Sequence, residues 1–309
     1  MIEVTGIAME PAIVEAVSAA NRSYQGMGEE AISAKIRKVD QSWDTPASNP
    51  AVQQILEAPG SRLLRRRRER SPRLLRITVT DEKGATIAAT HKTLDYFQAD
   101  EEYWQNIYAQ GRGAVSLTDV LYDEATKSYY IGVGVPVLQE GSNRVIGTLD
   151  ALVDVSSIFP LVNRVQIGPW GRAMLVKEDG TIISASQGVL SLKSKSEHYA
   201  AVQEAVQVDP GLGSGCLEAN IRGAGRNLIG FADVGLKTDY PKLGWYTLVS
   251  QDAREAFAPV ALVARLLGFL SLLGLASVTM LGAYFALHRK RPFTEIGDLR
   301  EEKSKAAQM

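Results

Sequence analysis

The chain contains few of the residues that form disulfides and metal centres. Cys216 is the only cysteine among 309 residues, so no disulfide can form within the chain. The three histidines, His91, His198 and His288, are scattered and form no cluster with the cysteine. This composition excludes a zinc site of the usual Cys/His type. We expect neither a bound metal nor a cofactor.

Common signatures of catalysis are also missing. There is no HExxH pair, no P-loop and no Ser/His/Asp order in a strand–turn context. The formal net charge is −1, from 34 basic and 35 acidic residues, which argues against wholesale nucleic-acid binding. We therefore expect a binding protein rather than an enzyme, and no nucleic-acid partner.

One stretch carries no charge at all. Leu266 to Leu287 comprises 22 residues, and a helix of that length spans about 33 Å at about 1.5 Å per residue, enough for a hydrocarbon core about 30 Å thick. A basic cluster, residues 288–291, follows directly, and such clusters normally stay in the cytoplasm. We predict a single-pass protein of the cell (inner) membrane with a transmembrane helix at 259–287. Residues 1–265 would then lie outside the cytoplasm and the tail 288–309 inside it.

The start of the chain lacks a targeting signal. Residues 1–30 contain no basic region followed by an apolar region. A domain of this size needs a signal to cross a membrane. We therefore expect a transmembrane helix to precede residue 1 in the intact protein, and the alternative is that the C-terminal helix inserts by another route.

The remaining sequence alternates helical and strand patterns. Apolar residues at three- and four-residue spacing predict one long helix over 11–43, and a short helix over 51–57. Strand patterns cover 74–90, 128–138 and 144–155, with a polar helix expected over 95–110. Eight arginines between residues 62 and 76 are interpreted as a solvated helix face, with contact to anionic lipid headgroups or an acidic ligand as the alternative.

The strand patterns then occur a second time. KGATIAAT at 83–90 matches DGTIISAS at 179–186, and YYIGVGVPV at 129–137 matches NLIGFADVG at 227–235, a period of about 95 residues. Such a period is too long for a solenoid repeat. We predict an α+β fold with a long N-terminal helix, two tandem antiparallel-sheet modules and one transmembrane helix. The expected divisions are a helical stalk at 1–60, a first module at 61–165 and a second module at 166–258.

This arrangement resembles the double Cache (tandem PAS-like) extracytoplasmic sensor domains of prokaryotic transmembrane receptors. The resemblance is carried by Asp81–Ala89 with Gly84, by Pro136-Val137, by Val145–Asp154, and by the later Asp179-Gly180 and Gly244–Val249. It implies that the membrane-distal first module holds a small ligand and that the second module passes the signal to the transmembrane helix.

The tail and the N-terminal helix suggest partners. Residues 289–306 resemble the start of a HAMP linker, which commonly opens with an Arg-Pro pair, here Arg291-Pro292. The resemblance implies a cytoplasmic signalling output in cis or in trans, and a homodimer paired through the long N-terminal helix. Two alternatives remain: the apolar stripe of that helix could cover the sheets of its own chain, and the chain could be an accessory membrane subunit that binds a partner protein.

The first module also contains a dense set of polar and aromatic residues. Residues 95–104 lie where Cache domains place a pocket-lining helix and loop, and they would face polar residues from the sheet. The predicted ligand-binding residues are Asp95, Tyr96, Gln98, Asp100, Glu101, Trp104, Tyr108, Asp123, Tyr130, Asp150 and Asp154.

The chemistry of this set predicts the class of ligand. Amino-acid-sensing members of the family carry an Arg-x-Trp-Tyr set and an Asp on the return strand; here those positions hold Glu102, Gln105 and Leu152. An α-amino-acid ligand is therefore disfavoured. The excess of carboxylates favours an amine, a cation or another small polar metabolite, with a metal ion held by oxygen ligands as an alternative.

Overall fold

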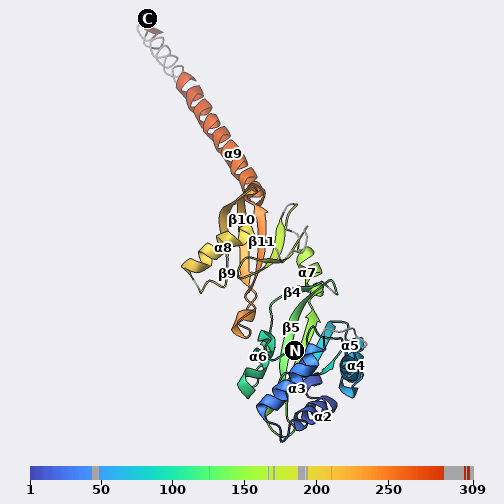
Figure 1. Ribbon diagram of the computed structural model, residues 1–309. Helices are drawn as coiled ribbons and strands as arrows, with labels where there is room; N and C mark the ends of the chain where they lie inside the picture. The colour runs from blue at the N-terminus through green and yellow to red at the C-terminus, as the bar shows by residue number, and fades with distance from the viewer. Residues whose placement is uncertain are drawn as a thin grey trace. The chain divides into compact units, whose positions relative to one another are not determined.

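The computed structural model describes residues 1–43, 49–124, 126–165, 167–169, 171–186, 192, 194–209, 211–288, 303, 305 and 306. Residues 1–251 form one compact unit, and the second unit, which begins at residue 252, contains a long helix (Figure 1). The expected HAMP-like segment, with its Arg291-Pro292 pair, lies outside the described residues apart from three positions.

Short helices open the chain. They are α1 (Ile2–Ala8), α2 (Pro11–Arg22), α3 (Glu29–Gln41), α4 (Pro50–Leu56) and α5 (Pro59–Arg70). The prediction of one continuous helix over 11–43 is wrong, because the chain turns between α2 and α3. Gly26 adopts a φ of +78°, which glycine tolerates and a helix does not use.

The first sheet is antiparallel. Its strands are β1 (Leu74–Asp81), β2 (Thr86–Ala89), β3 (Ser116–Leu117), β4 (Leu121–Asp123), β5 (Ser128–Leu138) and β6 (Val145–Asp154). They lie in the order β2-β1-β6-β5-β3, and β4 also pairs with β5. The expected helix over 95–110 is shorter than predicted. Only α6 (Glu102–Tyr108), followed by the short 3-10 turn η1 (Ala109–Gly111), is helical there.

The second sheet repeats this topology. Strands β7 (Arg172–Lys177), β8 (Ile182–Ala185), β9 (Ser214–Ile221), β10 (Gly225–Asp233) and β11 (Trp245–Asp252) lie in the order β8-β7-β11-β10-β9. If each sheet is counted from its own first strand and β4 is left aside, the two orders are identical. Helix α8 (Glu197–Val208) occupies the place of α6, between the second and third strands. The predicted internal repeat is therefore confirmed.

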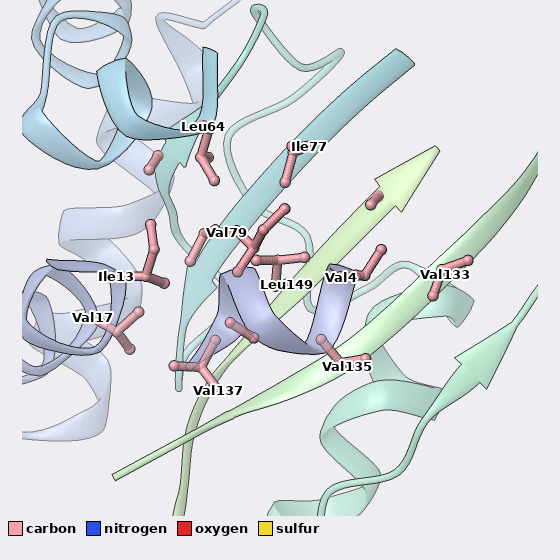
Figure 2. Packing of buried hydrophobic residues seen from close by; sticks show 14 of the residues in the cluster. Val4, Ile13, Val17, Leu64, Ile77, Val79, Val133, Val135, Val137 and Leu149 are labelled. Carbon is pink, nitrogen blue, oxygen red and sulfur yellow. The ribbon is translucent and has the colours of Figure 1, made fainter. Parts of the chain in front are cut away.

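Helices α1, α2 and α5 cover one face of the first sheet. Val4, Ile13 and Leu64 point from these helices onto apolar strand residues such as Val79 and Leu149 (Figure 2). The apolar side of α2 thus covers the sheet of its own chain. Because strand side chains alternate between faces, the residues between these apolar positions face the other way.

A smaller cluster joins the two sheets. Val120 and Val155, from the end of the first sheet, pack with Leu243 and Trp245, which lead into β11. The segment between the sheets contributes the 3-10 turn η2 (Ser156–Ile158) and α7 (Phe159–Asn163), and Phe159 belongs to the same cluster. The division between modules at residue 165 stays a prediction.

The second unit is dominated by α9 (Ala253–His288), a helix of 36 residues. In the described part of the chain it is the one helix that is long and apolar enough to cross a membrane. The predicted span 266–287 lies within it. The predicted fold class, mixed helices and two antiparallel sheets followed by an apolar helix, is confirmed.

Candidate functional site

A cavity of about 480 Å³ lies over the face of the first sheet that the N-terminal helices leave uncovered. Its floor comes from β1, β5 and β6, one side from the loop after β2 and from α6, and the other side from the segment around β3 and β4. The lining residues are Arg76, Thr78, Thr93, Leu94, Asp95, Gln98, Glu101, Glu102, Tyr103, Asn106, Thr118, Asp119, Leu121, Tyr130, Gly132, Asp150, Leu152 and Lys242.

The floor follows from strand register. Thr78 of β1 pairs with Asp150 of β6, and Arg76 pairs with Leu152. Directly paired residues share a face of the sheet, and successive residues alternate between faces. The polar side chains of these strands therefore gather under the cavity, while their apolar neighbours Ile77 and Ala151 point to the helices.

Close backbone contacts hold the side wall. The loop after β2 is fixed to the sheet by Gln98 N–H, which donates to Gly84 O (2.8 Å), and to α3 by Tyr96 N–H, which donates to Asp40 Oδ1 (2.9 Å). These contacts outside the loop explain why residues 95–101 are not helical. Gly84 has a φ of +83°, and a Cβ there would lie 2.5 Å from Ala99 Cβ, so glycine is required for the loop to approach.

Three polar side chains are linked along this wall. The Gln98 amide is 5% exposed and donates to the Asp95 carboxylate, while the Tyr103 hydroxyl donates to Gln98 Oε1. Burial, and then the nearby carboxylates of Asp150 and Asp95, raise the pKa of Tyr103, so the phenol stays protonated as a donor. The wall therefore presents an ordered acceptor, the Asp95 carboxylate, to the cavity.

Asp150 is the most strongly perturbed acid in the cavity. Burial raises its pKa from 3.8 to about 7, and the positive charge of Arg76 only partly opposes this effect. Among the described residues, none donates a hydrogen bond to the Asp150 carboxylate. A half-buried carboxylate of this kind gains from a cation that enters the cavity.

The cavity wall is rich in negative charge. Burial, followed by the neighbouring Glu101 and Asp100, raises the pKa of Asp95. Asp119 differs from these acids because Lys177 Nζ lies 3.1 Å from its carboxylate. Among the described residues, no group of three or more His, Cys, Asp or Glu side chains could hold a metal ion.

Five of the eleven predicted ligand-binding residues line the cavity. They are Asp95, Gln98, Glu101, Tyr130 and Asp150. The structure thus brings the acidic residues at the start of the 95–104 stretch close to Asp150, in the middle of β6. Their contact with a ligand stays a prediction.

The other six do not line the cavity, and five of them make structural contacts. The Trp104 indole N–H donates to Thr80 Oγ1 (2.8 Å), and its ring stacks on Tyr108 at 4.6 Å between centroids. Tyr96 packs on Trp43 at 5.4 Å. Asp154 accepts a hydrogen bond from Ser156 N–H (2.6 Å). The remaining two are Asp100, which is exposed, and Asp123, which accepts a hydrogen bond from the Thr126 hydroxyl.

Several lining residues were absent from the sequence prediction. Alternation along β1 places Arg76 and Thr78 on the polar face, but Arg76 was interpreted as part of the arginine run. On α6, the residues that face the cavity are Glu102, Tyr103 and Asn106, rather than Trp104 and Tyr108. No local signal could have revealed Lys242, which reaches the cavity from the second module.

Comparisons with known proteins agree with this architecture. A family model described as a Cache domain matches residues 12–260. The chain is 25% identical over 195 residues to the methyl-accepting chemotaxis protein PctB of Pseudomonas aeruginosa, covering 63% of this chain and 29% of that protein. The chain therefore spans less than a third of the length of that curated relative.

Solved structures of sensor domains also align with the chain. The ligand-binding domain of the P. aeruginosa amino acid chemoreceptor PctC, in complex with GABA, aligns with a TM-score of 0.45 at 16% identity, covering 78% of this chain and 96% of that one. The domain of the Campylobacter jejuni chemoreceptor Tlp3, in complex with 4-methylisoleucine, aligns with a TM-score of 0.47 at 12% identity, covering 78% and 89%. Because the family model covers most of the residues and both sheets share one strand order, the chain belongs to the double Cache family of sensor domains.

Proposed function

We propose that this chain is the extracytoplasmic sensory part of a transmembrane receptor, and that the cavity of its first module binds a small molecule with at least one ammonium group. The observation that carries this proposal is Asp150, a half-buried carboxylate in the cavity floor whose pKa is raised to about 7. An ammonium group placed over it would replace lost hydration with a charge-assisted hydrogen bond. The chain would act by binding, not by catalysis.

The wall chemistry supports the same ligand class. Asp95 and Glu101 add two carboxylates, and the Tyr103 hydroxyl donates to Gln98, which in turn donates to Asp95. Arg76 of β1 also lines the cavity, and its positive charge partly opposes the effect of burial on the pKa of Asp150. A ligand with a single ammonium group would place that group over Asp150, on the acidic side of the cavity.

The second sheet leads directly into the apolar helix. Strand β11 ends at Asp252 and α9 begins at Ala253 without a linker. We infer that occupancy of the cavity biases the position of β11 and hence of α9. On this proposal residues 1–265 are extracytoplasmic, the tail is cytoplasmic, and a homodimer passes the signal to a cytoplasmic output in cis or in trans.

A thermal-shift screen of the full chain in detergent tests the ligand class. Amines, carboxylates, sugars and divalent ions would be added in turn, and we expect stabilisation by amines. Asp150→Asn should abolish the shift, while Asp123→Asn, on the same sheet but away from the cavity, should keep it. An equal shift in both variants would contradict the assignment of the site.

A further inference from the structure

One residue of the second module lines the cavity of the first. Among the described residues that line it, Lys242 alone comes from beyond Leu152. Lys242 lies between the 3-10 turn η3 (Leu236–Thr238) and β11. Its Nζ lies 2.6 Å from the Glu102 carboxylate, and Glu102 is the first residue of α6. The two residues are 140 positions apart in the chain.

The backbone around Lys242 is firmly held. Leu243 and Trp245, which follow it, are 3% and 5% exposed and belong to the apolar cluster between the sheets. The Trp245 indole N–H donates to Asp119 Oδ1 (2.9 Å), and Lys177 Nζ donates to Val120 O (2.9 Å). Both acceptors belong to the segment between β3 and β4 that forms one wall. The second module therefore presents Lys242 at a fixed place on the rim.

The ammonium itself is free to change partners. The side chains of Lys242 and Glu102 are 53% and 81% exposed, so their ion pair lies at the mouth, where water and salt compete with it. A ligand in the cavity can compete for either partner. The ion pair also lowers the pKa of Glu102.

Lys242 supplies the positive charge at the mouth of the cavity. Asp119 is already paired with Lys177, and Arg76 lies at the floor strand β1. We propose that Lys242, from the second module, is a specificity-determining residue of the cavity, which favours ligands with an anionic outer end over ligands with a second ammonium group. The proposal rests on the proposed function, because it takes the cavity as the ligand site.

Two probes of equal chain length test this charge preference. Putrescine carries an ammonium group at each end, whereas γ-aminobutyrate carries one ammonium and one carboxylate. Isothermal titration of the full chain in lipid nanodiscs would measure both dissociation constants. In Lys242→Met, which keeps the aliphatic stem, we expect putrescine to bind about threefold more tightly and γ-aminobutyrate about threefold more weakly. Glu102→Gln should have the reverse effect, with weaker binding of putrescine and tighter binding of γ-aminobutyrate.

A matched ion pair provides the control. Lys237 Nζ lies 2.5 Å from the Glu178 carboxylate, with similar exposure at 49% and 52%, and neither residue lines the cavity. Lys237→Met should leave both affinities unchanged. General damage to the second module would weaken both probes together, so opposite shifts identify the charge of Lys242 as the cause.

Each outcome has a distinct meaning. If neither probe binds the parent chain, or if Asp150→Asn binds both probes as the parent does, the cavity is not the ammonium site and both proposals fail. If Asp150→Asn weakens binding but Lys242→Met behaves like Lys237→Met, or moves both probes in the same direction, Lys242 does not set specificity while the proposed function stands.

A measurement without ligand checks the contact itself. Hydrogen exchange followed by mass spectrometry should show faster exchange at the first turn of α6 in Lys242→Met than in Lys237→Met. Equal exchange in the two variants would show that Lys242 does not reach α6, and the proposal would be overturned.

Discussion

Replacing Asp150 with asparagine is expected to make the protein more stable and to weaken its binding of cations. The carboxyl of Asp150 has a pKa of about 7, against an ordinary value of 3.8. Between these two pH values the folded protein holds a proton that the unfolded chain releases. The free energy of unfolding therefore falls as the pH rises from about 4 to about 7. Asparagine does not titrate, so the free energy of unfolding of Asp150→Asn should not fall in this way as the pH rises.

The size of the effect follows from the pKa difference. Each pH unit corresponds to about 1.4 kcal/mol, so the gap between 3.8 and about 7 sets an upper bound of about 4 kcal/mol. Asp150 is intermediate in exposure and so keeps some contact with solvent, and Arg76, Tyr103 and Tyr130 face it from β1, α6 and β5. Solvent screening reduces the gain, and we expect about 1–2 kcal/mol at pH 8.

Thermal unfolding of the full chain in detergent measures this gain. At pH 8 the midpoint of Asp150→Asn should lie above that of the parent by about 2–4 °C for each kcal/mol. The gap should shrink as the pH is lowered toward 4. A variant that is less stable than the parent at pH 8, or a gap that does not change with pH, would refute the reasoning. Greater stability combined with weaker binding is the pattern expected of a functional residue.

Three further predictions follow from the cavity and its walls. Because the pKa of Asp150 is about 7, the affinity for a permanently cationic ligand should fall about tenfold for each pH unit below 7, and titrations in which affinity is flat with pH would contradict this. Trp104→Ala should cost about 3–5 kcal/mol of unfolding free energy in denaturant melts, whereas Trp104→Phe, which loses the hydrogen bond to Thr80 and part of the ring but keeps an aromatic side chain, should cost less and retain ligand binding. Gly134→Ala would place a Cβ 2.2 Å from Ile107 Cδ1, so it should lower the free energy of unfolding by about 1–3 kcal/mol, shift α6 and weaken ligand binding. Adding Ile107→Ala should restore part of the ligand affinity. If Gly134→Ala alone changes neither stability nor affinity, this contact is disproved.

Features set by local sequence were predictable. The two hairpins around Gly84 and Gly180 carry turn residues between alternating strands, and their similarity predicted the repeated sheet. The apolar helix and β5 were likewise predicted, because length and composition determine them. The register of β6 then placed Asp150 on the polar face.

Features set by distant contacts were not predictable. The loop before α6 bonds to Gly84 and to Asp40 of α3, so its helical pattern is overridden by contacts far away in the sequence. Trp104 has the indole donor of a ligand-binding residue, but it donates to Thr80 in the core. Lys242 enters the cavity only because the second module packs against the first, and no spacing in the sequence indicates that packing.

Hydrogen exchange of the full chain, with and without the ligand selected by the screen, tests the central claim most directly. We predict that the ligand slows exchange in residues 93–106, 116–123 and 128–132, which surround the cavity, and leaves β9 and β10 unchanged. Protection confined to the second sheet, or to the outer groove between α3 and Phe97, would show that the ligand binds elsewhere.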